Sequence, residues 1–270
     1  MTKTAFVAIV GKPNVGKSSL LNKMLGQKIA IVSSKPQTTR TKIMGVLTKG
    51  ETQLVFTDTP GFHKAHNKLG EKMNEAVGDT VGGVDACLFL TEPRGELNEQ
   101  ELQLLEMFKK QKMPVILAIN KIDMINDKEE LFKRIVYLTS FYDFTAVVPV
   151  SATEGDHVDE LIDELDKLAF ESPHFFPDDT LTDQPERVLA AEIIREKILR
   201  LMDKEIPHGI AVAVEKMRER DDKDILDIDA TIYCERESHK GMVIGKNGSM
   251  LKKVSTYARQ DLERFFQIKV

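Results

Sequence analysis

The most constraining feature of the sequence is a glycine-rich loop set between an apolar run and a helical segment. The run Ala5–Val10 leads directly into Gly11-Lys12-Pro13-Asn14-Val15-Gly16-Lys17-Ser18, and helix-spaced apolar residues continue to Leu25. This G-x-x-x-x-G-K-S pattern in a strand-loop-helix context is typical of a loop whose backbone N–H groups surround phosphate oxygens. We expect Lys17 to reach the β- and γ-phosphates and the Ser18 hydroxyl to bind Mg²⁺. The pattern predicts an α/β fold that binds a nucleoside triphosphate.

Apolar runs and helical segments alternate over residues 1–170. The runs read as buried strands at Ala5–Val10, Leu54–Thr57, Ala86–Leu90, Val115–Ile119 and Val147–Val150. Helical spacing of apolar residues is found between them at Lys17–Leu25, Leu97–Lys110, Glu129–Leu138 and Val158–Phe170. This order predicts an α/β domain with a mostly parallel sheet and helices on both faces. Thr41–Leu47 is a candidate for one further edge strand.

Composition narrows the class of protein. Of 270 residues, 41% are hydrophobic and 30% are charged, which excludes a disordered or collagen-like chain. The apolar runs are far shorter than the roughly 18 residues that span a bilayer, and the start lacks a secretory signal, so we expect an intracellular protein. Cys87 and Cys234 fall in different predicted domains and do not suggest a disulfide framework. The net charge of -5 gives no global basic field, so any nucleic-acid site must be local.

The pattern changes after a proline-containing stretch. Residues 171–186 hold three of the ten prolines and read as a linker. Beyond it, a helix is predicted over Arg187–Met202, strands over Ile210–Arg218 and Ile225–Glu235, and helical segments on both sides of Gly245–Gly248. We therefore divide the chain into a nucleotide-binding domain (1–170), a linker (171–186) and a second domain (187–270).

Three further motifs follow strands of the first domain. Asp58-Thr59-Pro60-Gly61 comes after the second buried run, where Asp58 suits Mg²⁺ through a bridging water and Gly61 allows backbone to approach the γ-phosphate. Asn120-Lys121-Ile122-Asp123 follows the fourth run. A carboxylate at Asp123 can accept from guanine N1–H and the 2-amino group together, which adenine cannot offer. We expect Asn120 to tie this loop to the phosphate loop and to meet N7, and the Lys121 stem to cover the ring.

Ser151-Ala152-Thr153 follows the last run and places the Ala152 N–H where guanine O6 is expected. Phosphate loop, D-T-P-G, N-K-I-D and S-A-T in this order resemble the translation-factor-related small GTPases. The resemblance implies a GTP or GDP ligand with Mg²⁺ held by Ser18, Asp58 and a threonine. The GTP-site residues that it implies are Gly11, Lys12, Pro13, Asn14, Val15, Gly16, Lys17, Ser18, Ser19, Asp58, Thr59, Pro60, Gly61, Phe62, Asn120, Lys121, Asp123, Ser151, Ala152 and Thr153.

The catalytic residues depart from the Ras-like pattern. The position after Gly61 holds Phe62 instead of a water-orienting glutamine, and His63 and His66 are more readily explained as solvated side chains. We therefore expect slow hydrolysis positioned by backbone groups, a partner or a monovalent cation. Asn14 resembles the asparagine of potassium-using GTPases, although it could instead only stabilise the loop.

A threonine of Lys35-Pro36-Gln37-Thr38-Thr39-Arg40 is expected to close onto Mg²⁺ when the γ-phosphate is present. By similarity to other T-T-R segments we choose Thr39, with Thr38 as the alternative. The predicted catalytic set is therefore Lys17, Asn14, Thr39 and Gly61.

The second domain carries a G-x-x-G sequence at Gly245–Gly248. Its predicted order of helix, two strands, helix, G-x-x-G and helix resembles a type II KH domain, which implies a groove for about four unstacked nucleotides. Five basic residues and no acidic ones lie between positions 240 and 260, although a solvated helix face could also account for some of them. The predicted RNA-binding residues are Ile244, Gly245, Lys246, Asn247, Gly248, Lys252 and Lys253.

The combination is similar to the Era family of ribosome-assembly GTPases. Matching stretches are K-P-Q-T-T-R at 35–40, D-T-P-G-F at 58–62, L-A-A-E-I-I-R-E-K at 189–197 and V-I-G-K-N-G at 243–248. The resemblance implies a monomeric GTPase that switches its binding of single-stranded RNA at the 3′ end of 16S ribosomal RNA and acts in 30S subunit assembly. It also implies a cytoplasmic pool with peripheral attachment to the inner face of the cell membrane.

One departure from that family lies at the end of the sequence. The family's KH sheet is completed by a strand bearing tryptophan, whereas this sequence ends at Val270 and contains no tryptophan. We therefore expect a KH sheet that lacks its last strand. Two other functions were weighed: a membrane-associated regulatory GTPase with secondary RNA binding, and a P-loop kinase acting on a small molecule, which would not need N-K-I-D.

Overall fold

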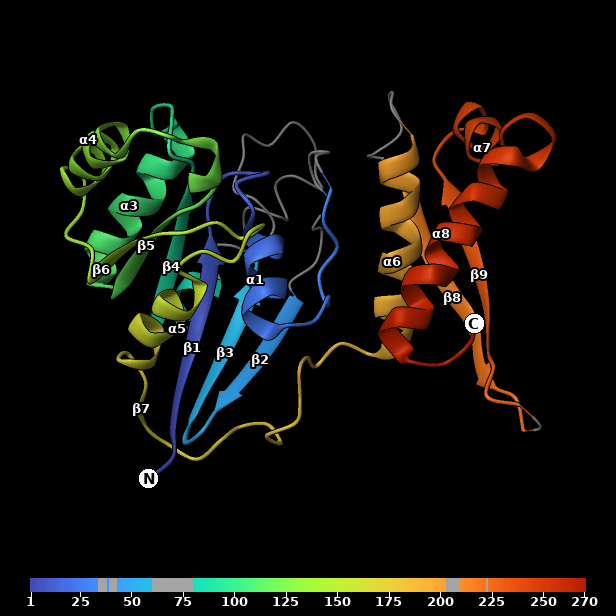
Figure 1. Ribbon diagram of the computed structural model, residues 1–270, viewed down its shortest axis with the longest axis horizontal. Helices are drawn as coiled ribbons and strands as arrows, with labels where there is room; N and C mark the ends of the chain where they lie inside the picture. The colour runs from blue at the N-terminus through green and yellow to red at the C-terminus, as the bar shows by residue number, and fades with distance from the viewer. Residues whose placement is uncertain (34–37, 39–42, 60–79, 203–208, 222) are drawn as a thin grey trace. The chain divides into compact units, whose positions relative to one another are not determined.

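The computed structural model describes residues 1–33, 38, 43–59, 80–202, 209–221 and 223–270 (Figure 1). It separates into two compact units. The first comprises Met1–Ile29 and Thr39–Asp183, and the second comprises Ala30–Thr38 and Gln184–Val270. Within the described parts, no helix combines the length and apolar character needed to cross a membrane.

The first unit is built on a seven-stranded sheet. Its strands are β1 (Lys3–Val10), β2 (Ile43–Lys49), β3 (Thr52–Asp58), β4 (Ala86–Thr91), β5 (Val115–Ile119), β6 (Ala146–Pro149) and β7 (Phe170–Glu171). The order is β2-β3-β1-β4-β5-β6, with β7 antiparallel on β1. Neighbours from β3 to β6 run parallel, while β2 is an antiparallel edge strand. The predicted mostly parallel α/β fold is confirmed.

Helices cover the sheet because the apolar strands are buried on both faces. They are α1 (Lys17–Leu25), α3 (Glu99–Gln111), α4 (Lys128–Thr139) and α5 (Val158–Asp166), with a short 3₁₀ turn, η1 (Ile122–Met124). Helices α1 and α5 contact each other, whereas α3 and α4 contribute to a cluster around Phe89, Phe108 and Leu138. The predicted helix over 158–170 is wrong at its end: α5 stops at Asp166, since Phe170–Glu171 pairs with β1 as β7.

The boundary between the units also differs from the predicted one. Residues up to 183 belong to the first unit because they pack on its sheet. The Gln53 side chain bonds the backbone of Phe175 and Phe176, Phe175 meets Phe6 edge-to-face at 5.0 Å, and the Leu181 carbonyl accepts from Val46 N–H. The segment predicted as a linker is therefore largely a packed strap.

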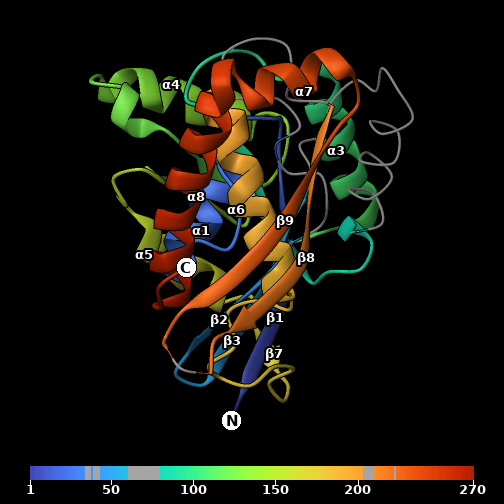
Figure 2. The same cartoon turned by 90° about the vertical axis from the view of Figure 1, so that its right-hand side faces the viewer.

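The second unit is an α+β arrangement. It contains α6 (Glu186–Leu201), β8 (Ile210–Glu219), β9 (Leu226–Cys234), α7 (Glu237–Ile244), a 3₁₀ turn η2 (Lys246–Gly248) and α8 (Ser249–Phe266). Figure 2 shows β8 and β9 as a long twisted antiparallel pair beside α6 and α8. Residues from every helix meet the strands in one core, which includes Ile193, Ile198, Ile210, Val243 and Leu262.

Residues 30–38 belong to the second unit although they lie between α1 and β2 in the sequence. Val32 N–H donates to the buried Glu196 carboxylate at 3.0 Å, and Val32 carbonyl accepts from Arg200 at 3.0 Å. The Arg195 guanidinium donates to the Thr38 carbonyl. All three side chains come from α6, so this helix holds a segment that the sequence assigned to the nucleotide-binding domain.

Candidate nucleotide and RNA sites

Four loops meet at one edge of the first unit's sheet. Strands β1, β4, β5 and β6 are parallel neighbours, so the loops that follow them leave from the same edge. In open α/β sheets this carboxyl edge is where ligands bind. The phosphate loop follows β1, the N-K-I-D loop follows β5 and the S-A-T loop follows β6.

The phosphate loop has the backbone that its glycines allow. Gly11 and Gly16 have φ angles of 149° and 104°, and a Cβ on Gly11 would lie 2.4 Å from the Leu90 carbonyl oxygen. Lys17 Nζ donates to the carbonyls of Gly11 and Lys12 at 3.0 and 2.9 Å. Burial lowers the pKa of Lys17 to about 8, against the opposing effect of Asp58. The loop thus holds a buried ammonium group at the start of α1, where an anion is favoured.

Ser18 and Asp58 form the part of the magnesium site that the structure describes. Ser18 Oγ donates to Asp58 Oδ2 at 2.5 Å, and Asp58 is fully buried. Burial raises the pKa of Asp58 to about 6, although the charge of Lys17 and the Ser18 hydrogen bond oppose this shift. Asp58 Oδ1 is a buried oxygen with no hydrogen-bond partner in the described structure. A hydroxyl beside a carboxylate with an unused oxygen fits the hard oxygen ligands that Mg²⁺ takes.

Asn120 joins three loops of the guanine-reading region. Its Nδ2 donates to the Val15 carbonyl of the phosphate loop at 2.8 Å, and its Oδ1 accepts from Ala152 N–H at 3.0 Å. Ser151 Oγ donates to Asp123 Oδ1 at 2.6 Å, which orients that carboxylate. The Ala152 N–H predicted to meet guanine O6 is therefore engaged with Asn120 here, and contact with the base requires that bond to be shared or exchanged.

The predicted RNA surface surrounds a tight turn between α7 and α8. Gly245, Asn247 and Gly248 have φ angles of 71°, 53° and 74°, and a Cβ on Gly245 would lie 2.7 Å from Met250 Cβ. Ile244, Lys246 and the α8 residues Lys252 and Lys253 are exposed around this turn. Exposed ammonium groups beside a glycine turn and an exposed apolar side chain provide the features of a groove for single-stranded nucleic acid.

Comparisons with known proteins match both units. A family described as 50S ribosome-binding GTPase matches residues 6–121, and the KH domain family matches residues 205–270. GTPase Era of Clostridioides difficile (strain 630) is 50% identical over 263 residues, covering 97% of this chain and 89% of the relative. GTPase Era of Thermoanaerobacter sp. (strain X514) is 50% identical over 266 residues, covering 98% and 87%. The chain belongs to the Era family of GTPases.

Solved structures of the Era family have the same fold. A variant of Aquifex aeolicus Era bound to GDP·AlF₄⁻ has a TM-score of 0.94 at 38% identity, and the match covers 100% of this chain and 91% of that one. A structure of Era with MgGDPNP and nucleotides 1506–1542 of 16S ribosomal RNA gives the same values. The predicted fold, a P-loop GTPase domain followed by a KH domain, is confirmed, and the chain is a GTPase that joins an RNA-binding module to its nucleotide site.

Several predicted Era-type site residues lie outside the described residues: Thr39, Pro60, Gly61, Phe62, His63 and His66. Thr59 is described, and its side chain does not face the nucleotide edge. It is 1% exposed and its Oγ1 donates to the Ile9 carbonyl of β1 at 2.8 Å, so this hydroxyl satisfies the sheet. Thr38, the alternative magnesium ligand, is 8% exposed.

Sequence reasoning missed one charged residue at the nucleotide edge. Glu92 directly follows β4, and its carboxylate pairs with Lys12 of the phosphate loop and Lys121 of the N-K-I-D loop, both at 2.5 Å. Its place after a parallel strand is the same signal that singled out Asp58 and Asn120. No known motif covers it, so the signal went unread.

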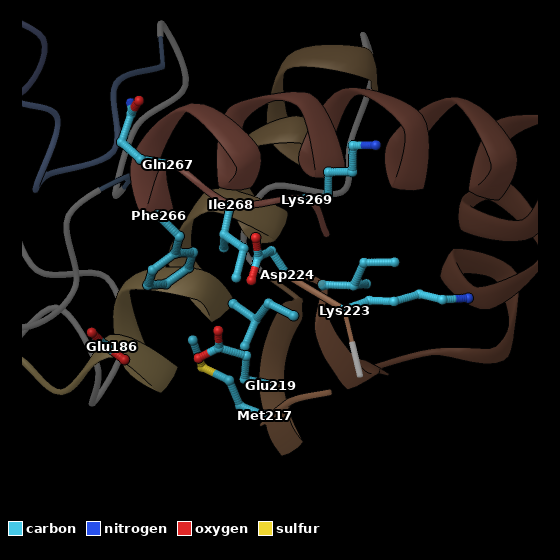
Figure 3. Close-up of a pocket in the computed structure, with 11 residues that line it drawn as sticks. Glu186, Met217, Glu219, Lys223, Asp224, Phe266, Gln267, Ile268 and Lys269 are labelled. Atoms are coloured by element: carbon cyan, nitrogen blue, oxygen red, sulfur yellow. The ribbon is translucent and has the colours of Figure 1, made fainter. Parts of the chain in front are cut away.

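A pocket in the KH unit lies beside the end of the chain (Figure 3). Ile225 forms an isolated parallel bridge with Lys269, and Leu226 N–H donates to the Lys269 carbonyl at 2.7 Å, so the last residues turn back along the start of β9. In the described residues the KH sheet has the two strands β8 and β9. Three carboxylates and two lysines line the pocket, which does not favour RNA phosphate; the acidic residues are Glu186, Glu219 and Asp224.

We predict that Gly16→Ala weakens GDP binding by at least about tenfold, because forcing a side chain onto a positive-φ residue costs about 1–2 kcal/mol even before the clash. The new Cβ would lie 2.2 Å from Asn120 Nδ2 and would displace the bond to Val15. Fluorescence titration with mant-GDP measures the change.

Gly26→Ala is the matched control. Gly26 also has a positive φ, 67°, but a Cβ there meets nothing within 4 Å. We expect it to lower stability modestly and to leave GDP affinity unchanged. Equal GDP affinities for the two variants would contradict the role given to the Asn120 tie.

Proposed function

We propose that this chain hydrolyses GTP in order to switch its binding of single-stranded RNA at the 3′ end of 16S ribosomal RNA, during 30S subunit assembly. The RNA target is supported by the solved Era complex that contains nucleotides 1506–1542 of that RNA. The observation that carries the proposed switch is the attachment of residues 30–38 to α6 of the KH unit.

Residues 30–38 provide a physical route between nucleotide and RNA. In the sequence they run from the helix that starts at the phosphate loop toward the threonine pair expected to close onto Mg²⁺. In the second unit, Arg195, Glu196 and Arg200 of α6 bond the backbone at Val32 and Thr38. Ordering of a segment by γ-phosphate and Mg²⁺ is a common GTPase switch. A change in this segment therefore acts directly on the helix that packs against α8, which carries Lys252 and Lys253.

We predict that labelled RNA of the 16S 3′-end sequence binds tighter with a non-hydrolysable GTP analogue than with GDP, by about 5- to 150-fold, the usual range of coupling between sites. Fluorescence anisotropy titrations with the analogue, with GDP and without nucleotide measure the difference. Arg195→Met removes the bond to Thr38, and we expect it to shrink the ratio between nucleotide states.

Two variants make this RNA experiment specific. Arg187→Met changes an exposed arginine at the start of the same helix and should preserve the full ratio. The double variant Lys252→Ala, Lys253→Ala should lose affinity in every nucleotide state, because it removes phosphate contacts. If the unaltered chain binds RNA equally in all three states, the two sites are not coupled and the proposed switch is wrong.

We further propose that hydrolysis by this chain is slow and uses K⁺ bound near Asn14. Asn14 is exposed at the phosphate loop in a left-handed conformation, φ 63°, and its carbonyl accepts from Lys121 Nζ at 2.8 Å. A monovalent cation beside the phosphates can stabilise the charge that develops in the transition state, as an arginine finger does.

The potassium proposal predicts hydrolysis at least about tenfold faster in KCl than in NaCl of equal concentration, a modest share of what a transition-state cation can supply. Single-turnover phosphate release measures both rates. Asn14→Ala should lower the rate in KCl to the rate in NaCl and leave GDP affinity in NaCl largely intact. Identical wild-type rates in the two salts would remove K⁺ from the mechanism.

We also propose that the protein is monomeric, with a cytoplasmic pool and a peripherally membrane-attached pool, as the Era-family resemblance implies. Cosedimentation with vesicles of phosphatidylglycerol and phosphatidylethanolamine tests the attachment, and we expect a bound fraction that 1 M NaCl releases, since surface charge attraction is screened there. The same bound fraction on neutral phosphatidylcholine vesicles would contradict an electrostatic attachment, and light scattering checks the monomer.

A further inference from the structure

Glu92 occupies a central place in the nucleotide edge of the first unit. It is the first residue after β4, and β4 lies between β1 and β5 in the sheet (Figure 1). The loops after β1 and β5 are the phosphate loop and the N-K-I-D loop. A side chain that follows β4 is therefore placed between the loop that holds phosphates and the loop that reads the base.

The two oxygens of Glu92 are divided between these loops. Oε2 pairs with Lys12 Nζ and Oε1 with Lys121 Nζ, each at 2.5 Å. Lys121 Nζ also donates to the Asn14 carbonyl at 2.8 Å. Although partial burial by itself raises the pKa of Glu92, hydrogen bonds and charges from Lys12 and Lys121 hold it below its usual range.

The backbone around Glu92 is itself fixed by α4. Arg134, only 7% exposed, donates from Nε to the Glu92 carbonyl at 3.0 Å and from its guanidinium to the Gly95 carbonyl. The Arg134 guanidinium lies 5.2 Å from the Tyr137 ring centre, and the Tyr137 hydroxyl accepts from Leu97 N–H at 3.2 Å. The turn that presents the Glu92 carboxylate is therefore held at several points.

We propose that Glu92 is a positioning residue for guanine nucleotide: it holds Lys121 and Lys12 so that the ring-covering stem and the phosphate loop keep their spacing. This inference rests on the proposed binding of GTP at this edge. Without the carboxylate, two ammonium groups that share its two oxygens repel each other and the two loops lose their common tie.

An ordinary surface ion pair contributes little, about 0–1 kcal/mol. Three features set Glu92 apart from such a pair. Its side chain is 28% exposed, it is shared by two lysines on separate loops, and one of those lysines is held at a second acceptor. Loss of the carboxylate should therefore change nucleotide retention more than it changes folding.

The test compares mant-GDP dissociation from the full chain and from Glu92→Gln, which keeps the shape of the side chain. We expect the dissociation rate to rise about fivefold, in the range of a lost charge-assisted hydrogen bond. The thermal midpoint of the nucleotide-free protein should stay the same. Glu106→Gln is the matched control, because Glu106 pairs with Lys109 on the exposed face of α3 and should leave dissociation unchanged.

A double-mutant cycle separates positioning from a general loss of charge. If Glu92 acts through its lysines, Glu92→Gln should have little further effect in a Lys12→Met, Lys121→Met background. If Glu92→Gln lowers the thermal midpoint, Lys12→Met alone measures the same contact from its other end and should also speed dissociation.

The outcomes distinguish this inference from the proposed function. An unaltered chain that retains mant-GDP, with Glu92→Gln dissociating at the same rate, overturns the role of Glu92 and leaves the guanine site standing. An equal rise in the variant with both lysines removed also overturns it. Failure of the unaltered chain to bind mant-GDP overturns the guanine site and the role of Glu92 together.

Discussion

The buried amide of Asn120 is the interaction on which the nucleotide site depends. This one side chain, 2% exposed, donates to the phosphate loop at Val15 and accepts from the S-A-T loop at Ala152. Its removal would leave a buried carbonyl and a buried N–H without partners, which costs about 1–3 kcal/mol for each group. It also explains why Gly16 must be glycine, since the amide occupies the space that a Cβ there would fill. Phosphate binding and base recognition are therefore properties of one connected structure.

The second unit depends on a comparable buried polar contact, but one that is less completely satisfied. Glu196 is fully buried on α6 and is compensated by Val32 N–H, Arg200 and Lys197. Arg195 is 2% exposed and its Nη1 has no partner among the described atoms. Breaking a buried charge network on one side is costly, so residues 30–38 do not leave α6 without a compensating interaction. A nucleotide with Mg²⁺ provides such an interaction at the phosphate edge, which gives a small change there a defined energetic consequence on the KH helix.

Much of this architecture was predictable because local sequence and global fold agree. The phosphate loop and the apolar runs determine the sheet, and α1 has the predicted bounds, Lys17–Leu25. The S-A-T loop and the Asn120 tie follow from the rule that carboxyl ends of parallel strands share an edge. What local sequence could not show depends on contacts between distant segments. The strap at residues 171–183 is ordered by Gln53 and Phe6, and residues 30–38 are held by α6, far along the chain. Glu92 was missed because its partners are two lysines brought together only by the strand order.

The electrostatics of the site follow from the same burial that organises it. Lys17 and Asp58 lie in the interior, where the pKa of the lysine falls to about 8 and that of the aspartate rises to about 6. Each shift is against the charged form, and each charged form is the one that a ligand needs. Phosphate favours the protonated lysine, so binding takes up a proton at pH values above about 8, while Mg²⁺ favours the ionised aspartate and releases a proton below about 6. Between these values both groups already carry the charge that the ligand requires. Binding then exchanges their unfavourable burial for direct interaction with phosphate and metal, so the strain of two buried charges before binding becomes part of the driving force for holding the nucleotide.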